Sequence, residues 1–306
     1  MHRNSTDIGG SFMIENDHEA VQLCESGLQQ MWAGDAEAAI ETYDRALAVV
    51  ESDETRELIT IRKAEALIAA EREGAEITAL PAIVMRRRTP RHVYLAGYAL
   101  MRRHADAEDR KRALFYGEIA RKAAEALDDP FARANVLNGL GVILVADSQF
   151  SPGADAFIEA LDVIDDHRGD DERLRALRVS TIANLGGTKI LLDIPKEGIR
   201  LIESVLRNLT VTEHRTEAML DLAIGYMNIE QYMVAETFAR NALELATSRR
   251  QTRNANHLLG EICIRTQRYE EADGYFDVVA GYYPDFKNVK QLLVAVDLCS
   301  VVNWKA

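Results

Sequence analysis

Apolar residues recur every three or four positions along most of the chain, which is the pattern of amphipathic helices. Residues 54–73 are nearly all strong helix formers, and one face of this segment carries Leu58, Ile61, Ala64, Leu67 and Ile68. Valine and isoleucine follow the same helical spacing rather than the alternation typical of strands. The pattern therefore predicts helices for almost everything after Asn16.

A second pattern places small residues at fixed distances from later small and bulky residues. Gly27 is followed by Ala39, Tyr43 and Ala46 at offsets of 12, 16 and 19 residues. The same offsets lead from Gly260 to Ala272, Phe276 and Val279. Two antiparallel helices approach closely only where side chains are small, and a bulky side chain then fills the groove beside the crossing. The small anchor residues are Gly27, Gly97, Gly141, Gly186, Ala223 and Gly260.

The repeat predicts stacked helix pairs, because a single pair cannot bury its own apolar face. Its spacing is uneven. The 70 residues between Gly27 and Gly97 leave room for one poorly matching copy at about residues 54–88. The third copy fits the offsets only with a four-residue insertion, which we place in the charged run His104 to Arg112.

Composition narrows the class of protein. A hydrophobic content of 47% over 306 residues suffices for a long core, and a net charge of −13 argues against nucleic acid and anionic membranes as partners. Three cysteines lie far apart without a metal-binding spacing, which favours a reduced, cytoplasmic setting. Residues 1–17 are polar and lack an apolar leader pattern, so we expect a flexible tail there.

The repeated spacing resembles the tetratricopeptide repeat, whose pattern is W-x2-L-G-x2-Y, then A-x3-F, then P. The fourth copy matches both helices of that pattern through Leu137, Leu140, Gly141, Leu144, Gly153, Phe157 and Ala160. The tryptophan is replaced, and the middle periods exceed the usual length, as in long arrays of bacterial regulators. The resemblance covers residues 18–285, about seven copies. It implies an all-α, right-handed superhelical solenoid.

One more helix is expected after Pro284, from about Asn288 to Asn303. Its apolar positions run almost all the way round. We therefore predict that residues 286–306 form a cap over the last apolar groove, and we keep open a docking helix or a homodimer contact.

Signatures of chemistry are weak throughout the sequence. There is no nucleophile–base motif, phosphate-binding glycine loop or zinc spacing, so we expect no catalytic residue, cofactor or metal site. The pairs Asp165-Asp166 and Asp170-Asp171 could suggest calcium, but they lack EF-hand spacing. A solvated acidic loop that caps a helix is the favoured interpretation.

The resemblance implies a peptide-binding groove lined by the first helix of each pair. Mapping the family's exposed groove positions onto this sequence gives a set that includes Arg91, Tyr94, Tyr98, Arg102, Asn135, Asn138, Ser180, Asn184, Glu217, Asp221, Asn254, His257 and Glu261. Asparagine is a poor residue inside a helix, so several on one face suggest a use. Each amide carries a donor and an acceptor and can hold a peptide backbone, or it can bond to a neighbouring helix.

Charge is distributed unevenly along the chain. Residues 85–125 carry eleven Lys and Arg against five Asp and Glu, a local excess of +6. Such a patch can bind carboxylates or phosphates, or it can pair with acidic residues of the same chain. Tyr94 and Tyr98 lie one helical turn apart beside Arg91, which favours an acidic or aromatic peptide.

These observations predict a non-enzymatic scaffold or regulatory adaptor that holds an extended peptide in its groove. The alternative is a sensor that binds a small molecule or a signalling peptide and acts on a partner through its C-terminal helix.

Overall fold

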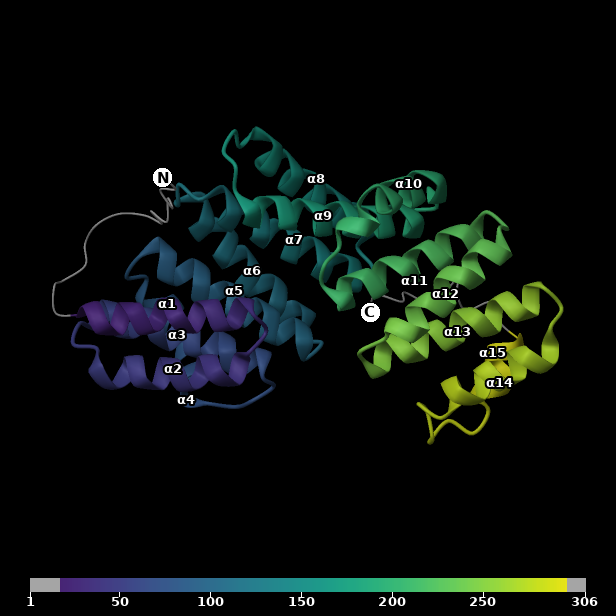
Figure 1. Cartoon of the computed structure of the whole chain (residues 1–306), viewed down its shortest axis with the longest axis horizontal. Helices are drawn as coiled ribbons and strands as arrows, with labels where there is room; N and C mark the ends of the chain where they lie inside the picture. Colours follow the sequence, from purple (N-terminus) through teal and green to yellow (C-terminus); the bar gives the residue numbers. More distant parts are fainter. Residues whose placement is uncertain (1–16, 296–306) are drawn as a thin grey trace, which may run out of the picture. The chain divides into compact units, whose positions relative to one another are not determined.

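A computed structural model describes residues 17–295 of the chain, and these form α-helices joined by short turns (Figure 1). A 3-10 turn at Leu206–Asn208 extends one of the helices. The helices are α1 (His18–Trp32), α2 (Ala36–Val49), α3 (Asp53–Ala69), α4 (Ala75–Arg86), α5 (Pro90–Asp106), α6 (Arg110–Glu125), α7 (Pro130–Ala146), α8 (Phe150–Asp166), α9 (Glu172–Leu191), α10 (Pro195–Val205), α11 (Thr212–Asn228), α12 (Tyr232–Leu245), α13 (Arg249–Arg265), α14 (Tyr269–Ala280) and α15 (Val289–Ala295).

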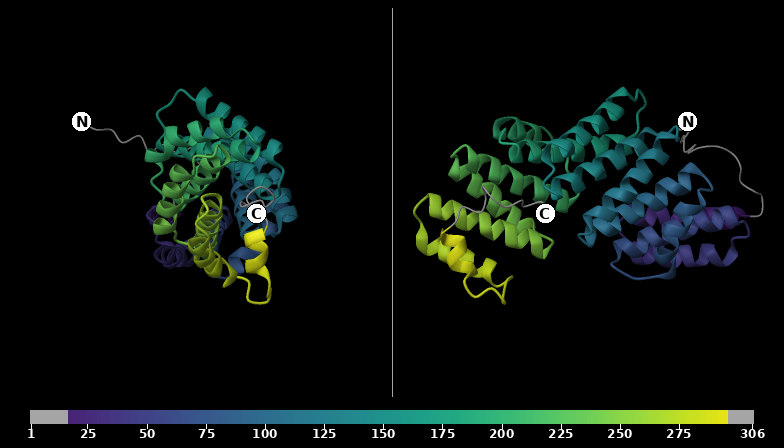
Figure 2. Two further views of the ribbon diagram at one scale, coloured as in Figure 1. Left: turned by 90° about the vertical axis from the view of Figure 1, so that its right-hand side faces the viewer. Right: turned by 180° about the vertical axis from the view of Figure 1, so that it is seen from behind.

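The chain divides into two compact units, 1–127 and 128–306. Unit one contains α1 to α6 and unit two contains α7 to α15. Within each unit the odd-numbered first helix of a pair packs on its own second helix and on the first helix of the next pair. Figure 2 shows this antiparallel stacking for the green and yellow helices of unit two. The first helices therefore make one layer in each unit, and the all-α helical-repeat architecture is confirmed.

Six of the seven pairs described in 17–295 share one turn. Each has three residues between its helices, and the central residue has a positive φ near 60°, or 82° at Gly34. The third residue of each turn donates its N–H to a carbonyl five residues back, as Asp109 does to His104 and Gln149 to Leu144, both at 2.8 Å. This is the Schellman ending of a helix. The turn thus fixes where each second helix begins.

The prediction of a four-residue insertion in the run His104 to Arg112 is wrong. Helix α5 continues to Asp106, and Ala107–Asp109 is a turn of ordinary length. Counting back five residues from the helix end, as for Gly141 in α7, gives Met101 as the anchor instead of Gly97. The longer turn is in the second pair, at residues 70–74, where two residues follow the Schellman bond before α4 begins.

The glycine anchors hold bulky partners as the spacing predicts. A Cβ added to Gly141 would lie 2.6 Å from the Phe157 ring. A Cβ added to Gly27 would lie at the same distance from the Tyr43 ring. At Gly260 the corresponding distance to Phe276 is 2.5 Å. All three rings are fully buried, so each crossing is closed by one ring seated on one glycine.

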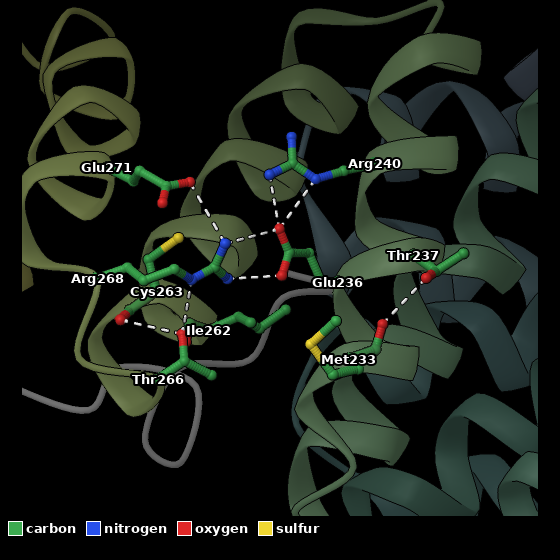
Figure 3. Close-up of polar contacts among 9 residues, drawn as sticks. All are labelled: Met233, Glu236, Thr237, Arg240, Ile262, Cys263, Thr266, Arg268 and Glu271. Atoms are coloured by element: carbon green, nitrogen blue, oxygen red, sulfur yellow. Dashed lines mark hydrogen bonds and ion pairs between the residues drawn. The ribbon is translucent and has the colours of Figure 1, made fainter.

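Between consecutive pairs of unit two, a buried carboxylate adds an ionic link. Figure 3 shows Arg240 and Arg268 converging on Glu236 of α12. Arg268, in the turn before α14, donates to Glu236 Oε2 at 2.6 Å, and Arg240 donates to Oε1 at 2.6 Å. These bonds and the Arg268 charge lower the pKa of Glu236, so the link is ionised at neutral pH.

The end of the array is covered by α15. Val289 and Leu293 are buried against Cys263, Phe276 and neighbouring residues of α13 and α14, as expected for a cap. The predicted helix from Asn288 to Asn303 therefore begins at the expected place, and its part beyond Ala295 lies outside the described residues, as does most of the predicted tail 1–17. None of the helices in 17–295 combines the length and apolarity that a membrane span needs.

The acidic loop before α9 caps that helix. Asp171 accepts the backbone N–H of Arg173 at 2.8 Å and pairs with its guanidinium, which lowers the pKa of the Asp171 carboxyl. Asp165 pairs with Arg178 on α9. The capping interpretation of the loop is confirmed at Asp171.

Candidate functional site

Two of the predicted asparagines meet on adjacent first helices of unit two. Asn184 of α9 donates its Nδ2 to Oδ1 of Asn138 on α7 at 3.1 Å. This is the interhelical bond that the sequence left open as one of two roles. Among the described contacts it uses one atom of each amide, which leaves Nδ2 of Asn138 as a donor and Oδ1 of Asn184 as an acceptor.

The amide pair borders a pocket of about 260 Å³ on the layer of first helices. Its walls come from α7, α8, α9, α11, the start of α13 and the segment before α11. The lining residues are Asn138, Val142, Val145, Phe157, Ser180, Ala183, Asn184, Thr188, Leu209, His214, Glu217, Ala218, Asp221 and Arg250. Of the mapped groove residues, the structure therefore brings Asn138, Ser180, Asn184, Glu217 and Asp221 together.

One side of the pocket carries a carboxylate held by two donors. Glu217 Oε1 accepts from Arg250 and from Gln251, each at 2.9 Å. Gln251 is fully buried and also bonds to the backbone of Thr247 and Glu213. Gln251 thus holds the N-terminal end of α13 against α11 and sets the position of the Glu217 side chain.

Asp221 lies on the same side, one turn along α11. It was expected to be exposed, but its side chain is buried because it packs directly over Gly187 of α9. A Cβ at Gly187 would clash with the carboxylate of Asp221. Gly187 is therefore the residue that makes room for this acidic group.

The predicted residues of α13 form a separate buried set. Asn254, His257 and Glu261 were expected on an exposed groove face and are each at most 3% exposed. Asn254 Oδ1 accepts from Arg253, His257 stands against the ring of Phe276, and His257 Nε2 lies 3.6 Å from Glu261 Oε1. Burial, with a contribution from Arg253, lowers the pKa of His257 to about 4.

The remaining predicted residues are distributed over both units. Asn135 of α7 is half-buried and does not line the pocket. In unit one, Arg91 and Arg102 are exposed at the two ends of α5, as expected. Tyr94 was also expected to be exposed but is buried, with its ring 6.0 Å from that of Tyr98.

Much of the basic segment pairs within unit one. Arg86 and Arg88 lie 3.2 Å and 3.8 Å from Glu57 Oε2, and Nδ1 of His92 lies 3.5 Å from Glu57 Oε1. Both Glu57 and His92 are buried, and burial lowers the pKa of His92. Arg103 pairs with Glu73. Internal pairing, one of the two roles left open by the sequence, therefore holds for these three arginines.

Several pocket residues escaped the sequence prediction. Val142 is at one of the mapped positions, directly after the anchor Gly141, but it was not singled out there. Thr188 lies one residue from a mapped position, and Phe157 belongs to a second helix. Leu209 and His214 belong to the connection before α11 and to its first turn. Spacing gave no signal for this connection, because Gly186 and Ala223 are 37 residues apart, as are Ala223 and Gly260.

Comparison with known proteins gives a likeness in fold. No protein-family model and no curated protein sequence matches the chain. A Rap protein complexed with the competence and sporulation factor is 14% identical, with 92% of this chain and 79% of that chain covered and a TM-score of 0.67. NprR in complex with its cognate peptide NprX is 13% identical, with coverages of 92% and 83% and a TM-score of 0.66.

A tetratricopeptide repeat protein from Parabacteroides merdae is 12% identical, with coverages of 90% and 97% and a TM-score of 0.53. These identities show the fold alone. The repeated pairs in 17–295, the shared turn and the small-residue crossings agree with that likeness. The chain therefore has the helical-repeat fold of tetratricopeptide repeat proteins.

Proposed function

We propose that this chain is a non-enzymatic, peptide-binding regulatory adaptor whose first helices in unit two hold an extended peptide. The carrying observation is the Asn138–Asn184 pair. Its bond leaves one donor group and one acceptor at the pocket border, and one peptide unit offers the complementary C=O and N–H. Such contacts recognise a backbone irrespective of its side chains.

The comparisons support a peptide as the ligand class. Two of the similar structures were solved with a peptide or signalling factor bound, which is a statement about those proteins. The charge of this chain weighs against nucleic acid, as the sequence predicted. In unit one, the exposed Arg91 and Arg102 remain proposed contacts for an acidic segment of a partner.

The test begins with peptides selected on the full chain from a random dodecapeptide library. The double substitution Asn138→Ala with Asn184→Ala should weaken the binding of the selected synthetic peptides at least tenfold, as measured by calorimetric titration. The unfolding midpoint should change little, because removing both partners of a hydrogen bond leaves no unsatisfied group. Asn241→Ala, at an exposed position of α12, is the matched control and should bind like the wild type.

The two parts of the proposal fail separately. A library that yields no enriched peptide would remove the peptide-binding function. Enriched peptides that bind the double variant as tightly as the wild type would remove the asparagine clamp and leave the function in place.

The alternative sensor function is favoured by one feature of α15. Leu292 and Val294 are exposed on this helix, while Val289 and Leu293 are buried. A chain lacking Lys290–Ala306 separates the two roles. A cap should leave the deletion less stable, whereas a signalling helix should leave peptide affinity intact and abolish partner or dimer assembly, measured by light scattering.

A further inference from the structure

The pocket of unit two has an apolar floor. Val145, Phe157, Ala183 and Ala218 line it and are each at most 6% exposed, so they form its deepest part. They come from α7, α8, α9 and α11, which are parts of three consecutive helix pairs. Leu209 of the connection before α11 is also buried in the lining, so the floor is built mainly, but not wholly, by the repeated helices.

The rim of the pocket is polar. Asn138, Ser180, Asn184, Glu217 and Arg250 are all half-buried rather than fully buried. Val142 interrupts this rim and is 46% exposed, which extends the apolar wall outward. The buried hydroxyl of Thr188 is satisfied locally, because it donates to the backbone carbonyl of Asn184 at 2.8 Å. The deep part of the pocket is therefore mainly apolar, with the buried side chains of Asp221 and Thr188 as its polar members.

We propose that this pocket takes one apolar side chain, branched or aromatic, from the extended peptide, while the amide pair holds the adjoining peptide unit. The inference rests on the proposed function and adds the residue class that the site selects. A volume of about 260 Å³ lies below the roughly 300–1,000 Å³ of sites for whole small ligands. It suits a single anchoring side chain.

Charge at the pocket excludes an acidic anchor. Asp221 and Glu217 place two carboxylates on the α11 side of the pocket, and Arg250 adds one guanidinium, which bonds to Glu217. A third carboxylate would meet repulsion at short range and would lose its water on the apolar floor. A lysine would be attracted by these carboxylates, but its ammonium group would lose its water at the apolar floor. We therefore expect the site to prefer neutral, apolar side chains.

The probes are acetylated, amidated pentapeptides Ala-Ala-X-Ala-Ala, with X as Leu, Phe, Ala, Lys or Glu. Each is titrated into the full chain, and chemical shifts of the Asn138 and Asn184 side-chain amides report binding. The Leu or Phe peptide should bind at least tenfold more tightly than the Ala peptide, and the Glu peptide should bind most weakly.

A matched pair of variants tests the wall of the pocket. Val142→Asn should reduce the Leu-over-Ala preference several-fold. Ile158→Asn makes a comparable aliphatic-to-amide change at 42% exposure on α8, outside the pocket lining, and should keep the preference. Both positions are surface-accessible, so both variants are expected to fold.

Four results would overturn the proposal. They are equal binding of the Leu and Ala peptides, a preference for Lys, no response by any peptide of the series, and a Leu response seen only in a chain ending at Ala295. The last would assign the pocket to residues 296–306. The proposed function is judged independently, by whether the random library yields peptides.

Discussion

The third and fourth helix pairs show two solutions to the same crossing. In the fourth pair, α7 supplies Gly141 and α8 supplies the Phe157 ring that covers it. In the third pair, α5 supplies the buried Met101, and Gly117 of α6 occupies the position equivalent to Phe157. Both pairs have the same three-residue turn and nearly equal helix lengths. In these two pairs the crossing thus joins one bulky and one small residue, and opposite helices supply them.

The units also differ in how they use buried polar groups. In unit one, the buried Glu57 lies among Arg86, Arg88 and His92 of the same unit. In unit two, Asn138, Asn184 and Glu217 are half-buried at the border of the pocket. We therefore assign a packing role to the polar groups around Glu57 and propose that those around the pocket serve binding.

The largest expected effect tests the inverted crossing. Met101→Gly should lower the free energy of unfolding by about 2–5 kcal/mol, because it leaves a cavity, and Gly117→Phe should also destabilise by overpacking. Combining them recreates the fourth pair in unit one. The double variant should recover at least about 1 kcal/mol relative to the sum of the singles in urea unfolding.

The matched control is a second double-mutant cycle, made of Gly141→Met, Phe157→Gly and their combination. It introduces the residues of the third pair at the crossing of the fourth pair. Strict additivity in both cycles would show that the paired positions do not face each other. The two crossings would then not be equivalent.

A smaller expected effect is the pH dependence of the free energy of unfolding that His257 of unit two causes. The pKa of His257, about 4, lies below the ordinary value of 6.5, so the folded protein keeps this ring neutral while the unfolded chain takes up a proton. Stability is therefore complete above pH 6.5 and is lost as the pH falls toward 4. Between pH 7.5 and 5, the free energy of unfolding should fall by about 2 kcal/mol from this group.

The measurement compares urea unfolding at both pH values. His257→Gln should flatten this part of the profile, whereas His18→Gln at an exposed position of α1 should not. An unchanged profile in His257→Gln would assign the loss to His92, whose pKa is also lowered by burial, in unit one.

The smallest effect concerns two arginines of the basic segment. Arg86→Ala removes a donor from the buried Glu57 and should cost about 1 kcal/mol, since its own side chain is 56% exposed. Arg102→Ala, at an exposed position of α5, should stay within about 0.5 kcal/mol of the wild type. Equal thermal midpoints for the two variants would contradict the packing role given to unit one.

Most of the fold followed from spacing alone, because close crossings demand small residues at regular intervals. The offsets after Gly27, Gly141 and Gly260 correctly located the helix crossings. The anchor of the third pair was predicted wrongly. Gly97 lies one helical turn before the true anchor position, and that position holds Met101, which a search for small residues does not find. The longer turn of the second pair went undetected, because its helices kept good amphipathic patterns on both sides.

The site was predicted less completely, since counting along one helix does not show what the next helix covers. Asn138 and Asn184 were found by mapping the family's groove positions, and the rarity of asparagine inside helices then gave them weight. Their bond to each other, and the burial of Asp221 over Gly187, depend on the approach of neighbouring pairs. The floor residue Phe157 is a packing residue in the repeat pattern, so its second use at the pocket has no separate sequence signal.

The shared turn has a consequence for engineering. Its central residue is left-handed in all six copies, yet glycine occupies that position only at Gly34. The others hold Glu108, Ser148, Asp193, Glu230 and Gln267, each of which bears the steric cost of a side chain in that conformation. The array thus contains five equivalent places where a glycine would relieve backbone strain without touching the pocket lining. A heat-resistant scaffold could be built from this chain by repeating one substitution.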